Sequence, residues 1–102
     1  MFKKLKSLFN GPSKAVQQLV DNGAILIDVR TPAEYHTGHL SNAQNIPLDV
    51  LYQKVESIKH LNKPVITVCR SGARSAIAKG ILTSAGIDAH DGGAWTNFKT
   101  SN

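Results

Sequence analysis

The sequence of 102 residues contains a single cysteine, Cys69, so it cannot form an intramolecular disulfide. Its cysteine usage therefore gives no sign of an oxidising compartment. The longest strongly apolar runs, AILI and VITV, are far too short to span a bilayer. The N-terminal segment MFKKLKSLFN is basic but lacks the apolar core of a signal peptide. We therefore expect a cytoplasmic protein rather than an integral membrane protein.

The chain also lacks an excess of positive charge outside its N-terminus. The net charge is +5, and Lys3, Lys4 and Lys6 supply three of those charges. Aromatic residues make up only 6% of the chain, so the clustered cations and stacking rings of a nucleic-acid interface are missing, and we expect no nucleic-acid partner. Residues 1–12 form a basic arm. Contact of residues 1–9 with a membrane surface is a weaker interpretation than packing of the arm on its own domain.

Apolar periodicity divides the rest of the chain into short strands and amphipathic helices. Strands are expected over residues 24–29, 43–47, 64–69 and 87–90. Helices are expected over residues 13–23, 31–38, 48–61 and 73–86. This alternation is typical of the α/β class, in which a parallel sheet is covered by helices on both faces. Residues 13–102 suffice for one hydrophobic core and are expected to form a single domain.

Several local signals refine these elements. Thr31, Pro32 and Glu34 have the order of an N-cap, a first helical residue and the acidic partner of a capping box. The helix expected over 48–61 carries one apolar stripe formed by Leu48, Leu51, Val55, Ile58 and Leu61. The helix that begins at Ala73 is expected to turn inward Ala73, Ala76, Ile77 and Ile81. The pair formed by Gly92 and Gly93 indicates a tight turn.

Polar residues stand at the ends of two of the expected buried strands. Asp28 and Arg30 follow the apolar run AILI, and Cys69 ends the run VITVC. In a parallel sheet the carboxyl ends of the strands lie at one edge, which is where ligands bind in this class of fold. These three residues are therefore expected to lie at the same edge of the sheet.

Without context, a lone cysteine is more often a small buried apolar residue than a nucleophile. Here the sequence context favours the nucleophile, because Cys69 is followed by a loop whose N–H groups can surround an anion at the start of a helix. That helix end and two arginines are expected to lower the pKa of the thiol. The expected anion-binding loop consists of Arg70, Ser71, Gly72, Ala73, Arg74 and Ser75.

The spacing within this loop limits the chemistry. No histidine lies in the loop to serve as a base, so a cysteine protease is not supported. Only four residues separate Cys69 from Arg74. A tyrosine-phosphatase loop has five at this place, so the shorter loop fits one sulfur atom better than a phosphoryl group.

Three separated motifs together resemble the single-domain rhodaneses, which are thiosulfate sulfurtransferases. They are LIDVRTPAEYHTGHLSNAQNIP, VCRSGARS and DGGAW. The resemblance implies a five-stranded, mainly parallel sheet flanked by helices on both faces, and a catalytic Cys69 that becomes a persulfide. The implied substrates are a small anionic sulfur donor such as thiosulfate and a thiol or cyanide acceptor, with a protein as a further possible donor or acceptor. No cofactor and no metal are expected.

For several other residues a structural role is favoured over a functional one. Asp28 and Arg30 could support the substrate, but a structural role is favoured, with Arg30 paired to Glu34 or another carboxylate. His36 and His39 have helical spacing but no further ligand nearby for a metal. Trp95 is expected to anchor the last helix on the core.

Two alternative functions remain open at this point. The first is a persulfide carrier or binding module that serves a protein partner without turning over free thiosulfate. The second, which the loop length disfavours, is a small cysteine phosphatase or arsenate reductase. A non-catalytic scaffold is least favoured because the cysteine is present.

Overall fold

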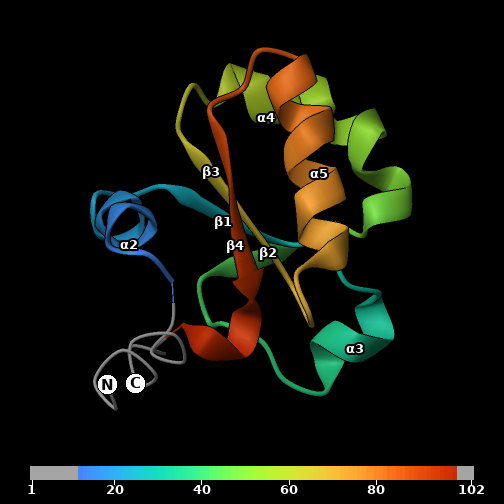
Figure 1. The fold of residues 1–102 in the computed structure, drawn as a ribbon. Helices are drawn as coiled ribbons and strands as arrows, with labels where there is room; N and C mark the ends of the chain where they lie inside the picture. Colours follow the sequence, from blue (N-terminus) through green and yellow to red (C-terminus); the bar gives the residue numbers. More distant parts are fainter. Residues whose placement is uncertain (1–11, 99–102) are drawn as a thin grey trace.

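The computed structural model describes residues 12–98, which form one parallel sheet with helices on both sides (Figure 1). The helices are α2 (Lys14–Asp21), α3 (Pro32–His36), α4 (Val55–His60), α5 (Ala73–Ser84) and two 3₁₀ helices, η1 (Leu48–Lys54) and η2 (Trp95–Asn97). The strands are β1 (Ile25–Asp28), β2 (Ala43–Asn45), β3 (Val65–Cys69) and β4 (Ala89–Ala94). Their order in the sheet is β2-β1-β3-β4, and all neighbouring strands are parallel.

The expected α/β class is confirmed, but the expectation of five strands is wrong for the part of the chain that the structure describes. Four segments of the sequence have strand character, and the described residues form strands at these four segments only. The fifth strand came from the family resemblance and not from any apolar run. The basic arm over residues 1–12, with the membrane contact of residues 1–9, lies outside the described residues except for Pro12. Among residues 12–98, no helix is long and apolar enough to cross a bilayer.

Alternation along the central strands gives the sheet two separate apolar faces. On β1 and β3, Ile27, Val65 and Cys69 point to the face that η1, α4 and α5 cover. Leu26 and Ile66 point to the opposite face, which α2 and η2 cover. Because both faces are buried, these strands are apolar at nearly every position. The strand end that carries Cys69 is therefore fixed between two cores.

The capping box expected at Thr31 is confirmed, and Ser13 provides a further cap that was not predicted. The side chain of Ser13 accepts a hydrogen bond from Val16 N at the start of α2. At α3 the hydroxyl of Thr31 accepts from Glu34 N, while the carboxylate of Glu34 accepts from Thr31 N at 3.0 Å. This reciprocal capping box satisfies amides that have no partner within the helix.

Two expected helices differ from the structure. The segment 48–61 is not one helix, because η1 passes into α4 at Val55, and Leu61 at its end is half exposed. The expected inward face of α5 is wrong for Ala73, Ala76 and Ile77, which are exposed, and is confirmed only for Ile81, which packs against the core. The helix buries instead Ser75, Ala78 and Leu82. Hydrogen bonds that hold Ser75 toward the end of β3 fix the rotation of α5, and Ile77 lies about 200° around the helix from Ser75.

Gly92 and Gly93 lie inside β4 rather than in a tight turn. The pairing of β4 with β3 shifts register between Thr67 and Cys69, and Gly93 has a φ of +74°. A Cβ atom at Gly92 would lie 2.9 Å from the carbonyl oxygen of Thr67 and 2.8 Å from a methyl group of Ile66. The two glycines therefore allow an irregular strand to pass close to β3.

Replacing Gly92 with alanine is expected to destabilise the protein by about 2 kcal/mol, because the added methyl group overlaps the backbone of β3. The free energy of unfolding in urea measures this effect. Gly80 is the matched control, since it is an exposed helical glycine whose added Cβ would contact nothing. Gly80→Ala is expected to stabilise α5 by about 0.5–1 kcal/mol. Equal effects of the two substitutions would contradict the close approach at Gly92.

Candidate active site

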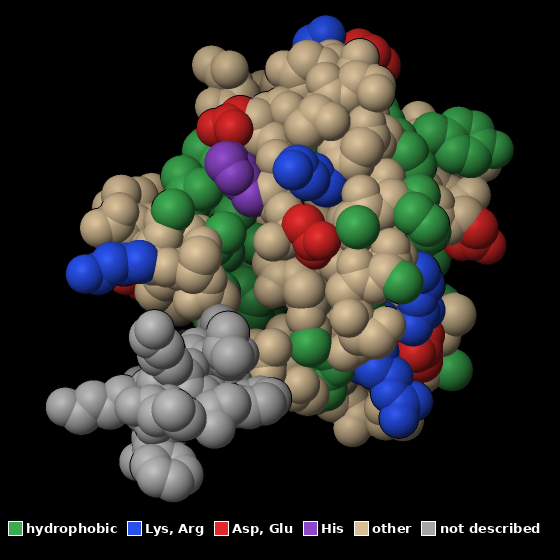
Figure 2. Space-filling view, in the orientation of Figure 1, with side chains coloured by type: hydrophobic (Ala, Val, Ile, Leu, Met, Phe, Trp, Pro, Cys, Tyr) green, Lys and Arg blue, Asp and Glu red, His purple; other side chains and the backbone are tan. Residues whose placement is uncertain are grey.

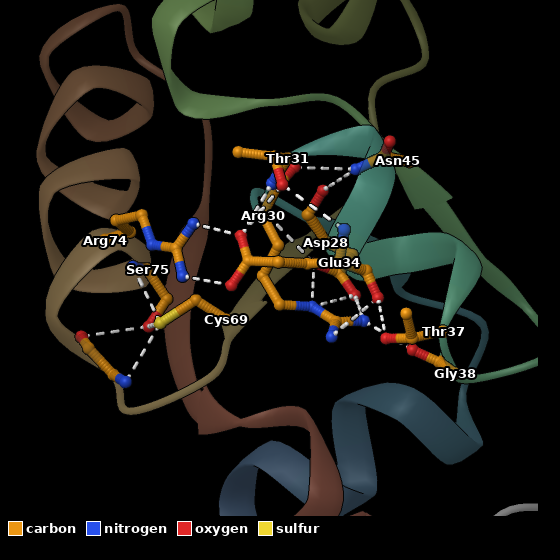
Figure 3. Close-up of polar contacts among 11 residues, drawn as sticks. Asp28, Arg30, Thr31, Glu34, Thr37, Gly38, Asn45, Cys69, Arg74 and Ser75 are labelled. Atoms are coloured by element: carbon orange, nitrogen blue, oxygen red, sulfur yellow. Dashed lines mark hydrogen bonds and ion pairs between the residues drawn. The ribbon is translucent and has the colours of Figure 1, made fainter.

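Cys69 is the last residue of β3, and its sulfur is surrounded by hydrogen-bond donors. The amide of Gly72 lies 2.9 Å from Sγ, and the amide of Ser75 lies 3.4 Å from it. The thiol itself can donate to the hydroxyl oxygen of Ser75, which lies 3.5 Å from Sγ. The side chain of Cys69 is fully buried. Two of the expected loop amides, those of Gly72 and Ser75, therefore contact the buried sulfur at the start of α5 (Figure 3).

Gly72 gives the loop its shape. Its φ of +100° lies in the left-handed region, which an L residue with a side chain rarely adopts. This conformation turns the amide of Gly72 toward Sγ, while its carbonyl accepts the first backbone hydrogen bond of α5 from Ala76. The turn of the chain and the start of the helix thus both place donors around the cysteine.

The pKa of the Cys69 thiol is lowered, as the sequence predicts. Burial acts to raise this pKa. Hydrogen bonds from the side chain and backbone of Ser75 and from the amides of Gly72 and Ser71 stabilise the thiolate and outweigh burial. The expected direction is confirmed, but the main cause is hydrogen bonding rather than the two arginines.

Ser75 links the cysteine to β4 as well as to its own helix. Its Oγ lies 2.6 Å from Oδ1 of Asp91, and that same oxygen accepts a hydrogen bond from Gly93 N at 2.9 Å. The carbonyl of Ser75 accepts a hydrogen bond from the buried hydroxyl of Thr67 at 2.8 Å. Ser75 is fully buried, whereas Asp91 reaches the surface. The first turn of α5 is therefore held by hydrogen bonds to both β3 and β4.

Arg74 is already paired with a carboxylate. Its two terminal nitrogens lie 2.7 and 2.9 Å from the two carboxylate oxygens of Glu34. This bidentate contact, together with the Thr31 amide, holds the pKa of Glu34 far below its usual value, and it raises the pKa of Arg74. The exposed Arg70 is the next cation along the loop. Figure 2 shows basic and acidic side chains side by side over α3 and the start of α5.

Asp28 and Arg30 lie at the carboxyl end of β1, next to Val68 of β3, so the expected position at the same sheet edge as Cys69 is confirmed. They form a buried ion pair with an N–O distance of 2.7 Å. Arg30 also donates to the carbonyls of Glu34 and Gly38. The expected carboxylate partner of Arg30 is thus Asp28, while Glu34 offers it only a backbone oxygen.

Three residues of the site were not identified from the sequence. Glu34 was expected to cap a helix or to pair with Arg30, yet its carboxylate holds the loop through Arg74, which lies 40 positions away in the chain. Asn45 donates from its side chain to the carbonyls of Asp28 and Arg30. Asp91 forms part of the DGGAW motif, which was the only signal available for it. Local patterns do not reveal such pairings.

Trp95 and the histidines behave as supporting residues. The guanidinium of Arg30 lies over the Trp95 ring at 4.6 Å from its centroid, so Trp95 packs on the buried ion pair. His39 stacks on Tyr35 and does not pair with His36. Within residues 12–98, no group of three or more metal-ligating side chains is assembled.

A polar hollow opens at the same edge of the sheet. Its lining consists of Arg30, Glu34, Thr37, Arg70, Trp95 and Thr96. Arg70, the exposed cation that directly follows Cys69, forms part of this lining. An anion that enters it would therefore meet a positive charge near the nucleophile candidate.

Comparisons with known proteins identify relatives of this chain and structures of similar fold. Residues 12–97 match the Rhodanese-like domain family. Thiosulfate sulfurtransferase GlpE of Pseudomonas fluorescens is 29% identical over 76 residues, which cover 74% of this chain and 69% of the relative. The structure of the human single-domain sulfurtransferase TSTD1 is similar with a TM-score of 0.67 and 26% identity, over 81% of this chain and 88% of that one.

A Bacillus subtilis relative, uncharacterized protein YqhL, is 43% identical over 63 residues. These residues cover 62% of this chain and 49% of the relative, so the match spans about half the length of that protein.

Proposed function

This chain belongs to the rhodanese-like domain family, and on that premise we propose that it is a sulfurtransferase whose nucleophile is Cys69. The observation that carries the proposal is the pair of amide donors, from Gly72 and Ser75, at a buried sulfur whose thiol pKa is lowered. A lowered thiol pKa increases the share of thiolate at neutral pH, and a thiolate needs no separate base.

The proposed reaction has two displacement steps. The Cys69 thiolate attacks the outer sulfur of thiosulfate, a new S–S bond forms, and the old S–S bond breaks with its electron pair leaving on sulfite. Cyanide or a thiolate then attacks the outer sulfur of the persulfide and restores the Cys69 thiolate. Both steps conserve electrons overall, so neither requires an external oxidant or reductant.

Different residues of the loop stabilise the negative charge on the sulfur and attract the anionic sulfur donor. The amides of Gly72 and Ser75 contact Sγ itself in this structure. We assign to them the stabilisation of the thiolate before attack and of the outer sulfur after it. The exposed Arg70 attracts the anionic donor. Arg74 shapes the loop through Glu34, because its charge is already paired.

Sulfur uptake by the full chain tests the proposal directly. After incubation with thiosulfate, intact-mass spectrometry is expected to show a gain of one sulfur atom, and later addition of cyanide is expected to release thiocyanate. Protein whose thiol has been blocked with iodoacetamide is the control. Uptake without repeated turnover would favour a persulfide carrier over an enzyme. No uptake from thiosulfate or from a persulfide donor would overturn the assignment.

A further inference from the structure

The hydroxyl group of Ser75 has one proton and three acceptors within reach. Its Oγ lies 2.6 Å from Asp91 Oδ1, 3.0 Å from the carbonyl oxygen of Gly72 and 3.5 Å from Cys69 Sγ. A carboxylate at the shortest distance is the strongest of these acceptors. While Cys69 is a neutral thiol, Ser75 therefore donates to Asp91, and its oxygen can accept a hydrogen bond from the sulfur of Cys69.

Ionisation of the thiol changes what Ser75 has to supply. A thiolate needs a donor, but the Ser75 proton can serve either the sulfur or the carboxylate and not both. We propose that Asp91 is a positioning residue that controls the reactivity of Cys69 by competing for the hydroxyl proton of Ser75. This inference rests on the proposed function, in which Cys69 is the nucleophile.

The placement of Asp91 fits this role. Its partner in the strand register is Thr67, whose hydroxyl donates to the carbonyl of Ser75. The irregular passage of β4 brings Gly93 N to the same carboxylate oxygen that Ser75 contacts. The carboxylate is thus held from two sides, while Ser75 is fully buried and has little freedom to move away.

Apart from the exposed Arg70, the remaining charged groups around Cys69 contact other partners. Asp28 and Arg30 at the end of β1 pair with each other at 2.7 Å. On α5, Arg74 is bound to Glu34 of α3, although its charge still acts on Cys69 through space. On β4, the side chain of His90 contacts Asp88. In the described part of the chain, Asp91 is therefore the carboxylate that reaches the sulfur through a shared hydrogen-bond partner.

Competition of this kind has a chemical consequence. Stabilising a thiolate increases its population, but the intrinsic nucleophilicity of the sulfur falls as its pKa falls. By holding the Ser75 proton, Asp91 limits how far the loop stabilises the Cys69 thiolate and so keeps the sulfur reactive. Ser75 then donates to the sulfur only when the gain at the sulfur exceeds the loss at the carboxylate.

The test is the pKa of the Cys69 thiol, measured from the pH dependence of its alkylation by iodoacetamide. Ser75→Ala removes the donor and is expected to raise this pKa by about one unit, from the usual worth of a hydrogen bond to a charged group. Asp91→Asn weakens the competing acceptor and is expected to lower the pKa by about half a unit. Because the two substitutions are expected to shift the thiol pKa in opposite directions, the measurement distinguishes the donor Ser75 from the competing acceptor Asp91.

The double variant Ser75→Ala/Asp91→Asn is expected to have the same pKa as Ser75→Ala alone, because Asp91 acts through Ser75. Asp88→Asn is the matched control, since it removes an exposed carboxylate that contacts His90 instead. An unchanged thiol pKa in Asp91→Asn would overturn the proposal. It would also be overturned if Asp88→Asn shifted the thiol pKa as much as Asp91→Asn does, or if Asp91→Asn caused the same shift in the presence of Ser75→Ala. If Ser75→Ala does not fold, the thiol pKa values of Asp91→Asn and Asp88→Asn are compared instead, and a lowered pKa in Asp91→Asn alone would support the proposal.

Sulfur uptake from thiosulfate by the unmodified protein is followed in parallel by intact mass. Alkylation reports the thiol pKa even in a protein that transfers no sulfur. Absence of uptake with the expected pKa shifts would therefore count against the proposed function alone, and uptake without those shifts would count against the role of Asp91 alone.

Discussion

Replacing Cys69 with serine is expected to abolish sulfur uptake from thiosulfate and to lower thiocyanate production on the order of a thousandfold or more. A serine hydroxyl at this position would keep the loop and its amides, but it is not ionised at neutral pH and no neighbouring histidine of the loop can activate it. The chain has no second cysteine that could replace the first. Intact mass after incubation with thiosulfate measures the uptake, and thiocyanate release measures the turnover.

Ser71→Ala is the matched control for this substitution. Ser71 lies in the same loop and is exposed, and it acts on the pKa of Cys69 through its backbone amide, which alanine retains. This variant is expected to take up sulfur at close to the original rate. Mass gain in Cys69→Ser would show that another nucleophile accepts the sulfur, and equal losses in both variants would indicate damage to the loop rather than loss of the thiol.

The parts of the fold that depend on neighbouring residues were predicted well from the sequence. The cap at Thr31 and its capping-box partner Glu34 have their expected contacts, because the two residues lie three positions apart. The strand ending at Cys69 was also placed correctly, since a run of buried apolar residues needs no distant information.

The failures arose where a distant contact determines the local structure. The periodicity of α5 allowed a face containing Ile77, but the bonds of Ser75 to Cys69, Asp91 and Thr67 fix a different rotation. The glycine pair in β4 was interpreted as a turn because its sequence does not show that Gly92 passes against the backbone of Thr67. In both cases a contact with a distant strand, absent from the local pattern, decided the outcome.

In the candidate site, too, the local features were predicted from the sequence and the distant contacts were not. The loop after Cys69 could be predicted because its donors belong to adjacent residues and its helix begins at once. The role expected for Arg74 as an anion-attracting cation changed because its partner, Glu34, lies far away in the chain. The sequence therefore located the sulfur and its amides, whereas only the structure shows which charges are already paired.

Removal of the Arg30 guanidinium is expected to destabilise the protein more than any other single substitution proposed for the scaffold. Arg30→Met keeps an apolar stem but leaves the Asp28 carboxylate buried without its countercharge, along with the carbonyls of Glu34 and Gly38. Breaking one side of a buried ion pair costs about 3–5 kcal/mol. Since small domains have a total stability of about 5–15 kcal/mol, urea unfolding is expected to begin at a much lower concentration.

The double variant Asp28→Asn/Arg30→Met separates the loss of attraction from the isolation of a buried charge. With the carboxylate removed, no unpaired charge remains in the core, so the double variant is expected to be more stable than Arg30→Met alone. Arg30→Lys keeps the charge but cannot reproduce the two-pronged contact with Asp28 or the stacking on Trp95, and it is expected to fall between the original protein and Arg30→Met. An unfolding free energy of Arg30→Met within about 1 kcal/mol of the original would show that the pair contributes little, as exposed pairs do. In that case the carboxyl end of β1 would be held in place by the Asn45 contacts and the packing of Trp95 instead.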